Sequence, residues 1–450
     1  MVSVVILAGG RGTRMRTQLP KPLCQIGGMS LIENAIERAL ALLPSQVIIV
    51  GSAALFVNCE WQTLFERLNT RISRFPGFLS GDKPRLIDVL QPDALGTGNA
   101  VHHALPFIKT ERVIIIHADM PFISVKTLQT LSESHDDLTI AVAPSTDATS
   151  SFGRVILREG VPVEIIEAKN ITGGVECRKF VNAASYSVSY SCLKTCLADI
   201  SKNDVTNEYY FTDIVKIACE HGFKTSYIEV SKNEAIGIDS PEALKQASLN
   251  LSQILEEQFC GVTFQNLQNV TLSMDTLIGE GSVIEGACAF GRKVVIGKNV
   301  VVHPFCVLEE CTIEDGCEIG PFAHIHKGST IRTGAVVGNF VEIKNSDIGC
   351  KTKAKHLAYI GDAFLGTSVN IGAGAIFCNY DGVKKHHSTV EDRASIGANV
   401  SLVAPIHIGE SAYVGAGSVI TKDVPAATLA LSRAPQVHNE EWVLKKKVTI

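Results

Sequence analysis

Residues 277–320 read LIGEGSVIEGACAFGRKVVIGKNVVVHPFCVLEECTIEDGCEIG, and in this stretch an apolar residue returns at almost every sixth position. The series runs through Ile278, Ile284, Phe290, Ile296, Val302 and Leu308, resumes after a five-residue step at Ile313, Ile319, Ile325, Ile331, Val337 and Ile343, and appears again at Ile396, Leu402, Ile408, Val414 and Ile420. A six-residue period fits neither a helix nor the alternation of one long strand. It fits short strands on the flat faces of a prism, with a tight turn at each corner. The stretch therefore predicts a left-handed parallel β-helix of hexapeptide repeats.

The length, net charge and apolar runs of the sequence indicate the number of domains and argue against several classes of partner. The 450 residues exceed one compact core and indicate two or three domains. A net charge of −5 gives no reason to expect binding to nucleic acid or to anionic lipid. No apolar run approaches the ~18 residues of a membrane span, and no basic leader precedes the first strand-like segment. We expect a cytoplasmic protein.

The 13 cysteines are odd in number and include no CxxC pair. Reduced thiols, some at interior repeat positions such as Cys306 and Cys317, are favoured over disulfides or a zinc site.

The N-terminal half alternates short apolar runs with helical patterns. The apolar runs are 4–7, 47–50, 86–90, 113–116 and 138–143, and helical patterns include 31–43 and 97–105. This alternation predicts an α/β, Rossmann-like domain with a mostly parallel sheet covered on both faces. Ligands of such sheets bind beyond the carboxyl ends of the strands, so the loops after Leu7, Leu90 and Ile116 share one rim.

The first of these loops, LAGGRGTRMRTQLPKPL at 7–23, is rich in glycine and basic residues. Its basic residues are Arg11, Arg14, Arg16 and Lys21, and no acidic residue follows before Glu33. Glycines after a buried strand let backbone N–H groups approach an anion whose charge the basic side chains offset. The loop matches neither the Walker pattern nor GxGxxG, and by composition alone it could be a solvated turn. The whole string, however, resembles the signature of the sugar-phosphate nucleotidyltransferases.

Downstream segments extend this resemblance. Gln91 and the LGTGNA of 95–100 resemble the segment that reads the base, and NEYYFTDI at 207–214 resembles a block that shapes the site. Asp119, after a strand, and Asp239, before a helix that Ser240 would cap, match the two Mg²⁺ ligands. The resemblance implies that Arg14 and Lys21 are catalytic and that UTP and the sugar phosphate bind at Leu7, Ala8, Gly9, Gly10, Lys21, Gln91, Gly96, Thr97, Asp119, Gly153, Glu167, Asn182 and Asp239.

The chain departs from the resembling family at two places in this half. His117 and Ala118 stand before the metal aspartate in place of an aromatic residue and glycine, and Ala183 and Ala184 follow Asn182 in place of Thr and Gly. We expect the local nucleotide and sugar contacts to differ there.

The segment from Val336 to Gly382 contains KHLAY, NIGAGA and CNYDG. It resembles the acetyltransferase domain of the bifunctional N-acetylglucosamine-1-phosphate uridyltransferase/glucosamine-1-phosphate acetyltransferases, and the resemblance covers about residues 3–436. It implies that His356 is the base that deprotonates the attacking amine, a role that imidazole suits near neutral pH. The implied glucosamine 1-phosphate ligands are His326, Lys344, Tyr359 and Asn370. The implied acetyl-CoA ligands are Ala373, Asn379, Tyr380, Ala398, Ala416 and Arg433.

Two departures also mark this half. His324 and His326 replace an arginine pair that holds the sugar phosphate, and Ala398 replaces a serine. Because histidine is only partly charged at pH 7, we predict a weaker affinity for the sugar phosphate that improves as the pH falls.

The resemblance also implies the organisation of the chain. It predicts a uridyltransferase domain at 1–239, a linker helix at 240–258, a β-helix at 259–436 and a C-terminal tail at 437–450. The interruption of the period between Phe377 and Val390 predicts a loop that leaves the prism. The resemblance implies that this loop reaches a neighbouring subunit of a homotrimer, where Lys385 would act. Lys445 to Lys447 could add positive charge near coenzyme A.

The leading prediction is a bifunctional enzyme of UDP-N-acetylglucosamine synthesis that serves peptidoglycan and lipid A production. It would acetylate glucosamine 1-phosphate from acetyl-CoA and then uridylylate the product from UTP with Mg²⁺. Two alternatives stay open at this point: a single-function nucleotidyltransferase with a regulatory or oligomerising β-helix, and a trimeric scaffold whose acetyltransferase site has decayed.

Overall fold

The computed structural model describes every residue except 11, 16, 18, 75–82, 146–151, 171–178, 205 and 447–450. Arg11 and Arg16, two of the basic residues of the glycine-rich loop, and Lys447 of the tail therefore lie outside the described residues. The chain divides into two compact units, Met1–Gln258 and Phe259–Ile450.

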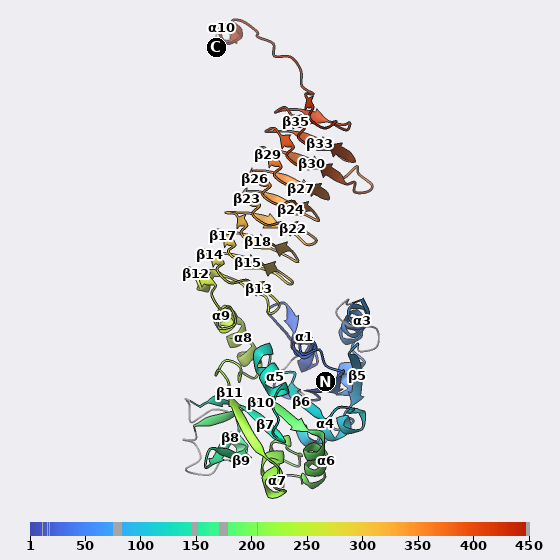
Figure 1. Cartoon of the computed structure of the whole chain (residues 1–450), viewed down its shortest axis with the longest axis vertical. Helices are drawn as coiled ribbons and strands as arrows, with labels where there is room; N and C mark the ends of the chain where they lie inside the picture. The colour runs from blue at the N-terminus through green and yellow to red at the C-terminus, as the bar shows by residue number, and fades with distance from the viewer. Residues whose placement is uncertain are drawn as a thin grey trace. The chain divides into compact units, whose positions relative to one another are not determined.

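A mixed sheet forms the centre of the first unit (Figure 1). Its strands are β1 (Val2–Ala8), β4 (Gln46–Gly51), β5 (Arg85–Leu90), β6 (Arg112–His117), β7 (Leu138–Pro144), β8 (Arg154–Arg158), β9 (Val161–Ile166), β10 (Phe180–Ser189) and β11 (Thr225–Glu229). The order is β11-β7-β10-β6-β1-β4-β5, with β8 and β9 attached at β10. The pairs of β1 with β4 and β6, of β4 with β5 and of β7 with β11 are parallel, whereas β10 runs antiparallel to both its neighbours. A two-stranded hairpin of β2 (Gln25–Ile26) and β3 (Met29–Ser30) precedes the first helix.

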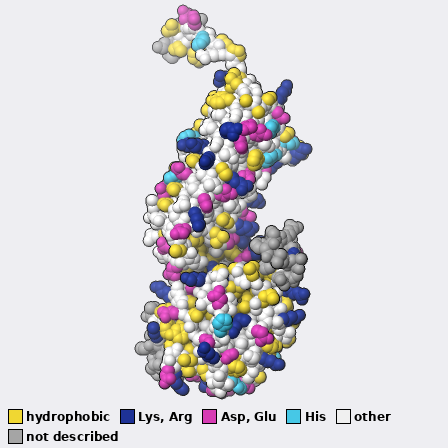
Figure 2. Space-filling model, in the orientation of Figure 1, with side chains coloured by type: hydrophobic (Ala, Val, Ile, Leu, Met, Phe, Trp, Pro, Cys, Tyr) yellow, Lys and Arg dark blue, Asp and Glu magenta, His cyan; other side chains and the backbone are white. Residues whose placement is uncertain are grey.

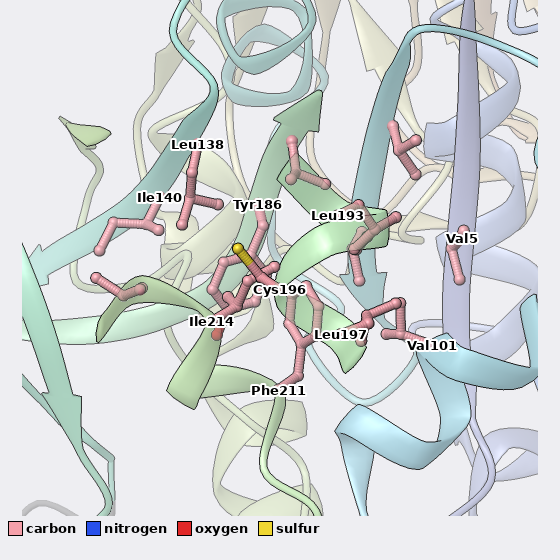
Figure 3. Packing of buried hydrophobic residues seen from close by; sticks show 14 of the residues in the cluster. Val5, Val101, Leu138, Ile140, Tyr186, Leu193, Cys196, Leu197, Phe211 and Ile214 are labelled. Atoms are coloured by element: carbon pink, nitrogen blue, oxygen red, sulfur yellow. The ribbon is translucent and has the colours of Figure 1, made fainter. Parts of the chain in front are cut away.

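Helices cover both faces of this sheet, because alternate residues of its strands are apolar on both sides. Along β1, Val5 and Leu7 join one buried cluster, and Val4 and Ile6 join the other. Figure 3 shows the first cluster, where side chains of α4, α6 and α7 meet those of β1 and β7. The helices are α1 (Leu31–Leu40), α2 (Ala53–Phe56), α3 (Cys59–Arg74), α4 (Thr97–Ala104), α5 (Val125–Ser132), α6 (Tyr190–Asp199) and α7 (Ile214–Glu220).

The predicted linker helix is two helices, α8 (Pro241–Leu249) and α9 (Leu251–Glu256). They are separated at Asn250, whose backbone angles of −101° and 8° leave the helical region. The N-cap prediction is confirmed, since the Ser240 hydroxyl accepts from the Ala243 N–H at 3.1 Å. Leu251 and Leu255 are buried, and both helices belong to the first compact unit.

The second unit consists of three parallel sheets, which we name after one member each. The β26 face contains β12 (Thr263–Phe264), β14 (Val283–Ile284), β17 (Val301–Val302), β20 (Glu318–Ile319), β23 (Val336–Asn339), β26 (Lys353–His356), β29 (Asn370–Ile371), β32 (Ser395–Ile396), β35 (Tyr413–Val414) and β37 (Leu429–Ala430). The β27 face contains β15 (Ala289–Phe290), β18 (Val307–Leu308), β21 (His324–Ile325), β24 (Glu342–Lys344), β27 (Tyr359–Gly361), β30 (Ile376–Cys378), β33 (Ser401–Val403) and β36 (Val419–Ile420). The β28 face contains β13 (Leu277–Ile278), β16 (Val295–Ile296), β19 (Thr312–Ile313), β22 (Thr330–Ile331), β25 (Asp347–Ile348), β28 (Ala363–Leu365), β31 (Ser388–Val390) and β34 (Ile406–Ile408).

The chain visits the three faces in turn, so each apolar residue of the six-residue series points into the prism. Ile284, Phe290, Ile296, Val302 and Leu308 are all at most 2% exposed. Each coil stacks on the next through parallel pairing, as Figure 1 shows from β12 to β35. The predicted fold class, an α/β nucleotidyltransferase domain followed by a left-handed parallel β-helix, is confirmed.

The predicted loop leaves the prism between β30 and β31. Beyond the last coil, residues 431–444 are exposed throughout, and α10 (Trp442–Lys446) begins among them. Every cysteine in the described part of the chain is free, and Cys306 and Cys317 are buried, as predicted. Acidic, basic and hydrophobic side chains are interspersed on the visible face of the β-helix (Figure 2). Among the described residues, none of the helices has the length and apolar character needed to span a bilayer.

Candidate active sites

Two ion pairs lie side by side at the rim of the first unit. Lys21 Nζ lies 2.5 Å from Asp119 Oδ2, and an Arg14 guanidinium nitrogen lies 2.9 Å from Asp239 Oδ2. A backbone hydrogen bond from Ile238 N to Asp119 O at 2.8 Å holds the two carboxylate-bearing segments together. The four predicted residues thus converge from three loops that are far apart in the sequence.

The electrostatics of Asp119 favour its charged form. Burial acts to raise the pKa of this carboxyl, but the Lys21 ammonium, with help from His117, more than offsets burial, so the pKa of Asp119 lies below its usual value. His117 itself is buried, which lowers its pKa despite the nearby Asp119. A deprotonated carboxylate is the form that binds a cation.

The glycines after β1 leave room for a ligand. A Cβ on Gly9 would overlap the Gln91 carboxamide oxygen, whereas a Cβ on Gly10 would meet no atom within 4 Å. Leu7 and Ala8 end β1, and Leu7 O accepts from Ala118 N at 3.0 Å. The strand ends carrying the glycine loop and Asp119 are therefore neighbours.

A second cluster surrounds Gln91. Its Nε2 donates to Gly96 O at 3.0 Å and to Asn99 Oδ1 at 2.9 Å. Thr97 Oγ1 accepts from Phe211 N at 2.9 Å. Gly96 has a φ of +98°, and a Cβ there would lie 2.5 Å from Tyr209 O, so only glycine fits.

Sequence reasoning missed this backbone role of Tyr209. Tyr209 N donates to Leu95 O and Tyr209 O accepts from Gly98 N, both at 2.8 Å, so the NEYYFTDI segment is bonded to the Gln91 cluster. The sequence signal for this contact is the glycine at position 96. The backbone there has a positive φ and lies against Tyr209 O, and both features require glycine.

The three residues predicted for the sugar meet at one end of β8, β9 and β10. Arg154 pairs with Val181 and with Ile166, so Gly153, Asn182 and Glu167 are the next residues at the same end. Asn182 N donates to Gly153 O at 2.9 Å, and the Thr212 hydroxyl donates to Glu167 Oε1 at 2.6 Å.

Asn182 is held by protein groups at both ends of its carboxamide. Its Nδ2 donates to the Tyr186 hydroxyl at 2.7 Å, and its Oδ1 accepts from Ala184 N at 3.0 Å. Ala184 has a φ of +50° and lies where the pairing of β10 with β7 shifts register. Ala183 and Ala184, the two residues expected to differ from the family pattern, therefore lie in a β-bulge, and the Asn182 side chain stabilises this bulge through its bond to Ala184 N.

In the β-helix, His356 ends β26 at the corner between the β26 and β27 faces. Its Nδ1 lies 2.8 Å from Asn339 Oδ1, and Asn339 occupies the paired position one coil earlier. Because a carboxamide oxygen only accepts, Nδ1 carries the proton and Nε2 keeps its lone pair. This is the tautomer that a base requires. The sequence analysis missed Asn339, although the repeat places it directly beneath His356.

The alanines predicted for acetyl-CoA continue the same corner. The inward residues of four successive strands on the β26 face pair in register, and the first of them is Ala354. His356 lies two residues after Ala354. The alanines occupy the same position in the next three strands: Ala373, Ala398 and Ala416. Asn399 N donates to Ala373 O and Gly417 N to Ala398 O, both at 2.8 Å. Arg433 extends the column, because its guanidinium donates to Ala416 O at 2.8 Å. The corner is a column of small residues with His356 at one end and Arg433 at the other.

Asp362, another residue that the sequence analysis missed, organises the polar groups beside Tyr359. Asn379 Nδ2 donates to Asp362 Oδ2 at 2.5 Å and lies 3.4 Å from the Tyr359 hydroxyl. Lys385 Nζ lies 3.8 Å from Asp362 Oδ2 of its own chain. Tyr380 is exposed and donates from its hydroxyl to Gly382 O at 2.7 Å.

The residues predicted for the sugar phosphate are not all on one face. His326 directly follows β21, and Lys344 and Tyr359 lie in β24 and β27, so the three belong to successive coils of the β27 face. Asn370 lies in β29 on the β26 face. A single chain thus separates Asn370 from the other three.

Comparison with known proteins covers both units. The MobA-like NTP transferase domain matches residues 4–183, and the bacterial transferase hexapeptide matches 310–345 and 387–422. The bifunctional protein GlmU of Thermotoga sp. (strain RQ2) is 37% identical over 98% of this chain and 99% of its own length. Those of Francisella philomiragia and Alkaliphilus metalliredigens are each 34% identical, over 98% and 99% of this chain.

The chain belongs to the family of the bifunctional GlmU proteins. It is therefore a transferase with two activities: acetyl transfer from acetyl-CoA to glucosamine 1-phosphate, and uridylyl transfer from UTP to N-acetylglucosamine 1-phosphate. The full-length match includes the β-helix, which argues against the alternative of a single-function nucleotidyltransferase.

Proposed function

We propose that uridylyl transfer occurs where the Lys21–Asp119 and Arg14–Asp239 pairs meet. Lys21 and Arg14 would bind phosphate oxygens of the two substrates, and the open side of Gly10 would admit the triphosphate. Gln91, Gly96 and Thr97 would hold the uracil, and Gly153, Glu167 and Asn182 would hold the sugar. The observation that carries the proposal is the hydrogen bond from Ile238 N to Asp119 O, which keeps the two carboxylates of distant segments at one site.

The donor set suits Mg²⁺. Asp119 and Asp239 offer hard carboxylate oxygens, and the pKa of Asp119 is low. When bound, Mg²⁺ would neutralise charge that develops on the phosphates during in-line displacement. The chain's own cations would then orient the attacking phosphate and the leaving pyrophosphate.

The test of this site uses the second activity of the same chain as its control. Asp119→Asn and Asp239→Asn should each reduce pyrophosphate release by about 100-fold or more and raise the Mg²⁺ concentration needed for half-maximal rate. Release of free coenzyme A should stay unchanged. Full pyrophosphate release from either variant at limiting Mg²⁺ would refute the assignment.

For acetyl transfer, we propose that His356 Nε2 takes the proton of the attacking amine. Asn339 holds the imidazole in the required tautomer. Lys344, His326, Tyr359 and Asn370 would bind the sugar phosphate, and the corner column from Ala373 to Arg433 would bind coenzyme A, with Asn379 and Tyr380 beside the acetyl group.

We also propose that this site is completed by a neighbouring copy in a cytoplasmic homotrimer. Asn370 lies on a different face from Lys344 and Tyr359, so both can reach one substrate if two copies place those faces together. The corner next to His356 carries an exposed apolar column, in which Phe305 stacks on Phe322 at 4.8 Å and Phe322 on Phe340 at 5.1 Å. Leu357, also exposed, continues this column beside His356. Such a surface is typical of an interface.

Sedimentation equilibrium would test the trimer. Phe322→Ser with Phe340→Ser should shift the protein towards monomer and lower acetyl transfer in parallel, because each site would lose its partner face. Val57→Ser, a change at an exposed apolar position of the first unit, serves as the matched control and should leave the trimer intact. A monomeric parent protein with full acetyl transfer would overturn the proposal.

A further inference from the structure

The two histidines that replace the arginine pair form a cluster with a carboxylate. His324 and His326 flank the inward Ile325, so both point out of the β27 face. Leu308 pairs with Ile325, which places Glu309 next to His326 in the neighbouring coil. One ligand atom each from Glu309, His324 and His326 lie within 4.8 Å of one another.

The distances are close to those of a metal site. Glu309 Oε2 lies 3.6 Å from His324 Nε2 and 3.6 Å from His326 Nδ1. Ligands at about 2.0–2.2 Å around a tetrahedral ion are separated by roughly 3.4 Å, so each carboxylate–imidazole distance needs to close by only a few tenths of an ångström, and all three ligand atoms already lie within 4.8 Å of one another. Glu309 is half-exposed and free to make that adjustment.

The hydrogen bonding leaves one nitrogen of each imidazole available to ligate an ion. His324 Nε2 is buried without a hydrogen-bond partner. His326 Nε2 lies 3.0 Å from Glu342 Oε1, and because a carboxylate accepts, Nε2 donates its proton there. In the neutral ring, Nδ1 then directs a lone pair at the Glu309 carboxylate, and two electron-rich atoms face each other. An imidazole that ligates through one nitrogen and donates to a carboxylate through the other is the common arrangement at metal sites.

We propose that Glu309, His324 and His326 bind a divalent transition-metal ion of the Zn²⁺ class, which takes the sugar phosphate at its open position. Imidazole with carboxylate favours Zn²⁺ and its neighbours over Mg²⁺. Ile325 pairs with Ile343, so Lys344 follows His326 in the next coil, about 4.8 Å along the stack. A phosphate could then bridge the ion and the Lys344 ammonium. The ion would supply the fixed positive charge that the histidines lack.

This role in phosphate binding rests on the proposed acetyltransferase site, but the metal site itself can be measured without activity. Metal-free protein would be titrated with ZnCl₂ by calorimetry in millimolar Mg²⁺, and with CoCl₂ by visible absorption. The expected result is one tight equivalent per chain that His324→Ala, His326→Ala or Glu309→Gln weakens by about 100-fold, with loss of the Co²⁺ band. His303→Ala is the matched control, because His303 also lies between two glutamates, Glu285 and Glu318, but next to no second histidine. Equal binding by the parent and the His326→Ala protein would overturn the site.

The proposed role of the ion in binding the sugar phosphate is measured separately, through enzyme kinetics. Zn²⁺ should lower the KM for glucosamine 1-phosphate by about tenfold or more in the parent protein, with kcat and pyrophosphate release unchanged. His324→Arg with His326→Arg should make that KM independent of Zn²⁺. Tight Zn²⁺ binding with an unchanged KM would refute phosphate capture by the ion, and a KM that improves only as the pH falls would indicate that a proton alone supplies the charge. Absence of acetyl transfer under all conditions would instead refute the proposed function and leave the calorimetric result standing.

Discussion

The two units gather their functional residues in different ways. In the first unit, the ends of adjacent strands bring Lys21, Asp119, Arg14 and Asp239 into two ion pairs within one chain. In the β-helix, the repeat arranges residues in columns along a corner and along separate faces, with Asn370 on one face and Lys344 on another. In a sheet covered on both faces, the ends of adjacent strands bring site residues together at one edge. In a prism of stacked coils, site residues lie along the length of a face or corner. The second kind of site is completed most simply by another copy.

The largest effect is expected from removing the base. His356→Ala should reduce coenzyme A release by about 10²- to 10⁴-fold, since a positioned base contributes that much to proton transfer. Pyrophosphate release from UTP and N-acetylglucosamine 1-phosphate should be unchanged. A parent rate as low as that of the variant would show that His356 does not act as the base.

Mixing inactive chains tests the comparison directly. Chains carrying Lys344→Ala or Asn370→Ala, co-expressed in equal amounts, should regain about a quarter of the parent acetyl transfer, because random assortment leaves that share of inter-chain sites intact. Asp119→Asn mixed with Asp239→Asn should regain no uridylyl transfer, since that site lies within one chain.

Complementation in neither mixture would place the acetyl site within a single chain. Complementation in both would mean that the first unit also shares residues between copies. Either result would remove the contrast between the two units.

A smaller effect is expected from the residue that positions the base. Asn339→Ala should lower kcat for acetyl transfer by about tenfold and shift its acidic limb, with the KM for acetyl-CoA unchanged, because His356 would lose the group that fixes its tautomer. Asn339→Asp keeps an acceptor at the same place and should recover most of the rate. A loss of folding would show in both variants and in pyrophosphate release alike.

The sequence predicted the repeat-based part of the molecule more completely than its irregular parts. The period predicted the burial of one residue per strand from Ile284 to Leu308, because each coil repeats the same packing problem. The period could not reveal that His326 would meet both Glu309 and Glu342, since neighbours across coils depend on the register and on side-chain rotamers. The linker helix divided at Asn250, where local backbone geometry prevailed over the apolar pattern. Tyr209 and Ala184 act through the backbone, which side-chain motifs do not record.

The smallest effect concerns the carboxyl group of Asp213, whose pKa is raised, in contrast to the lowered pKa of Asp119. Burial, together with the neighbouring Glu167, raises the pKa of Asp213 to about 6. Because the pKa of Asp213 is higher in the folded state, its protonated carboxyl stabilises the fold fully when the pH is below the unfolded-state pKa near 4. This stabilisation is lost as the pH rises through the folded-state pKa of about 6. Asp213→Asn resembles the protonated form at every pH. The variant should therefore match the parent at pH 4 and exceed it by about 1 kcal/mol at pH 8, after a discount for partial exposure.

Urea unfolding followed by the emission of Trp61 would measure this difference, since Trp61 is buried in the first unit and the other tryptophan, Trp442, is already exposed. Asp93→Asn, at an exposed position of the same unit, should shift the unfolding midpoint equally at both pH values. A gain for Asp213→Asn that is largest at pH 4 would reverse the sign and show that Asp213 has a cationic partner in the folded protein, as Asp119 and Asp239 do.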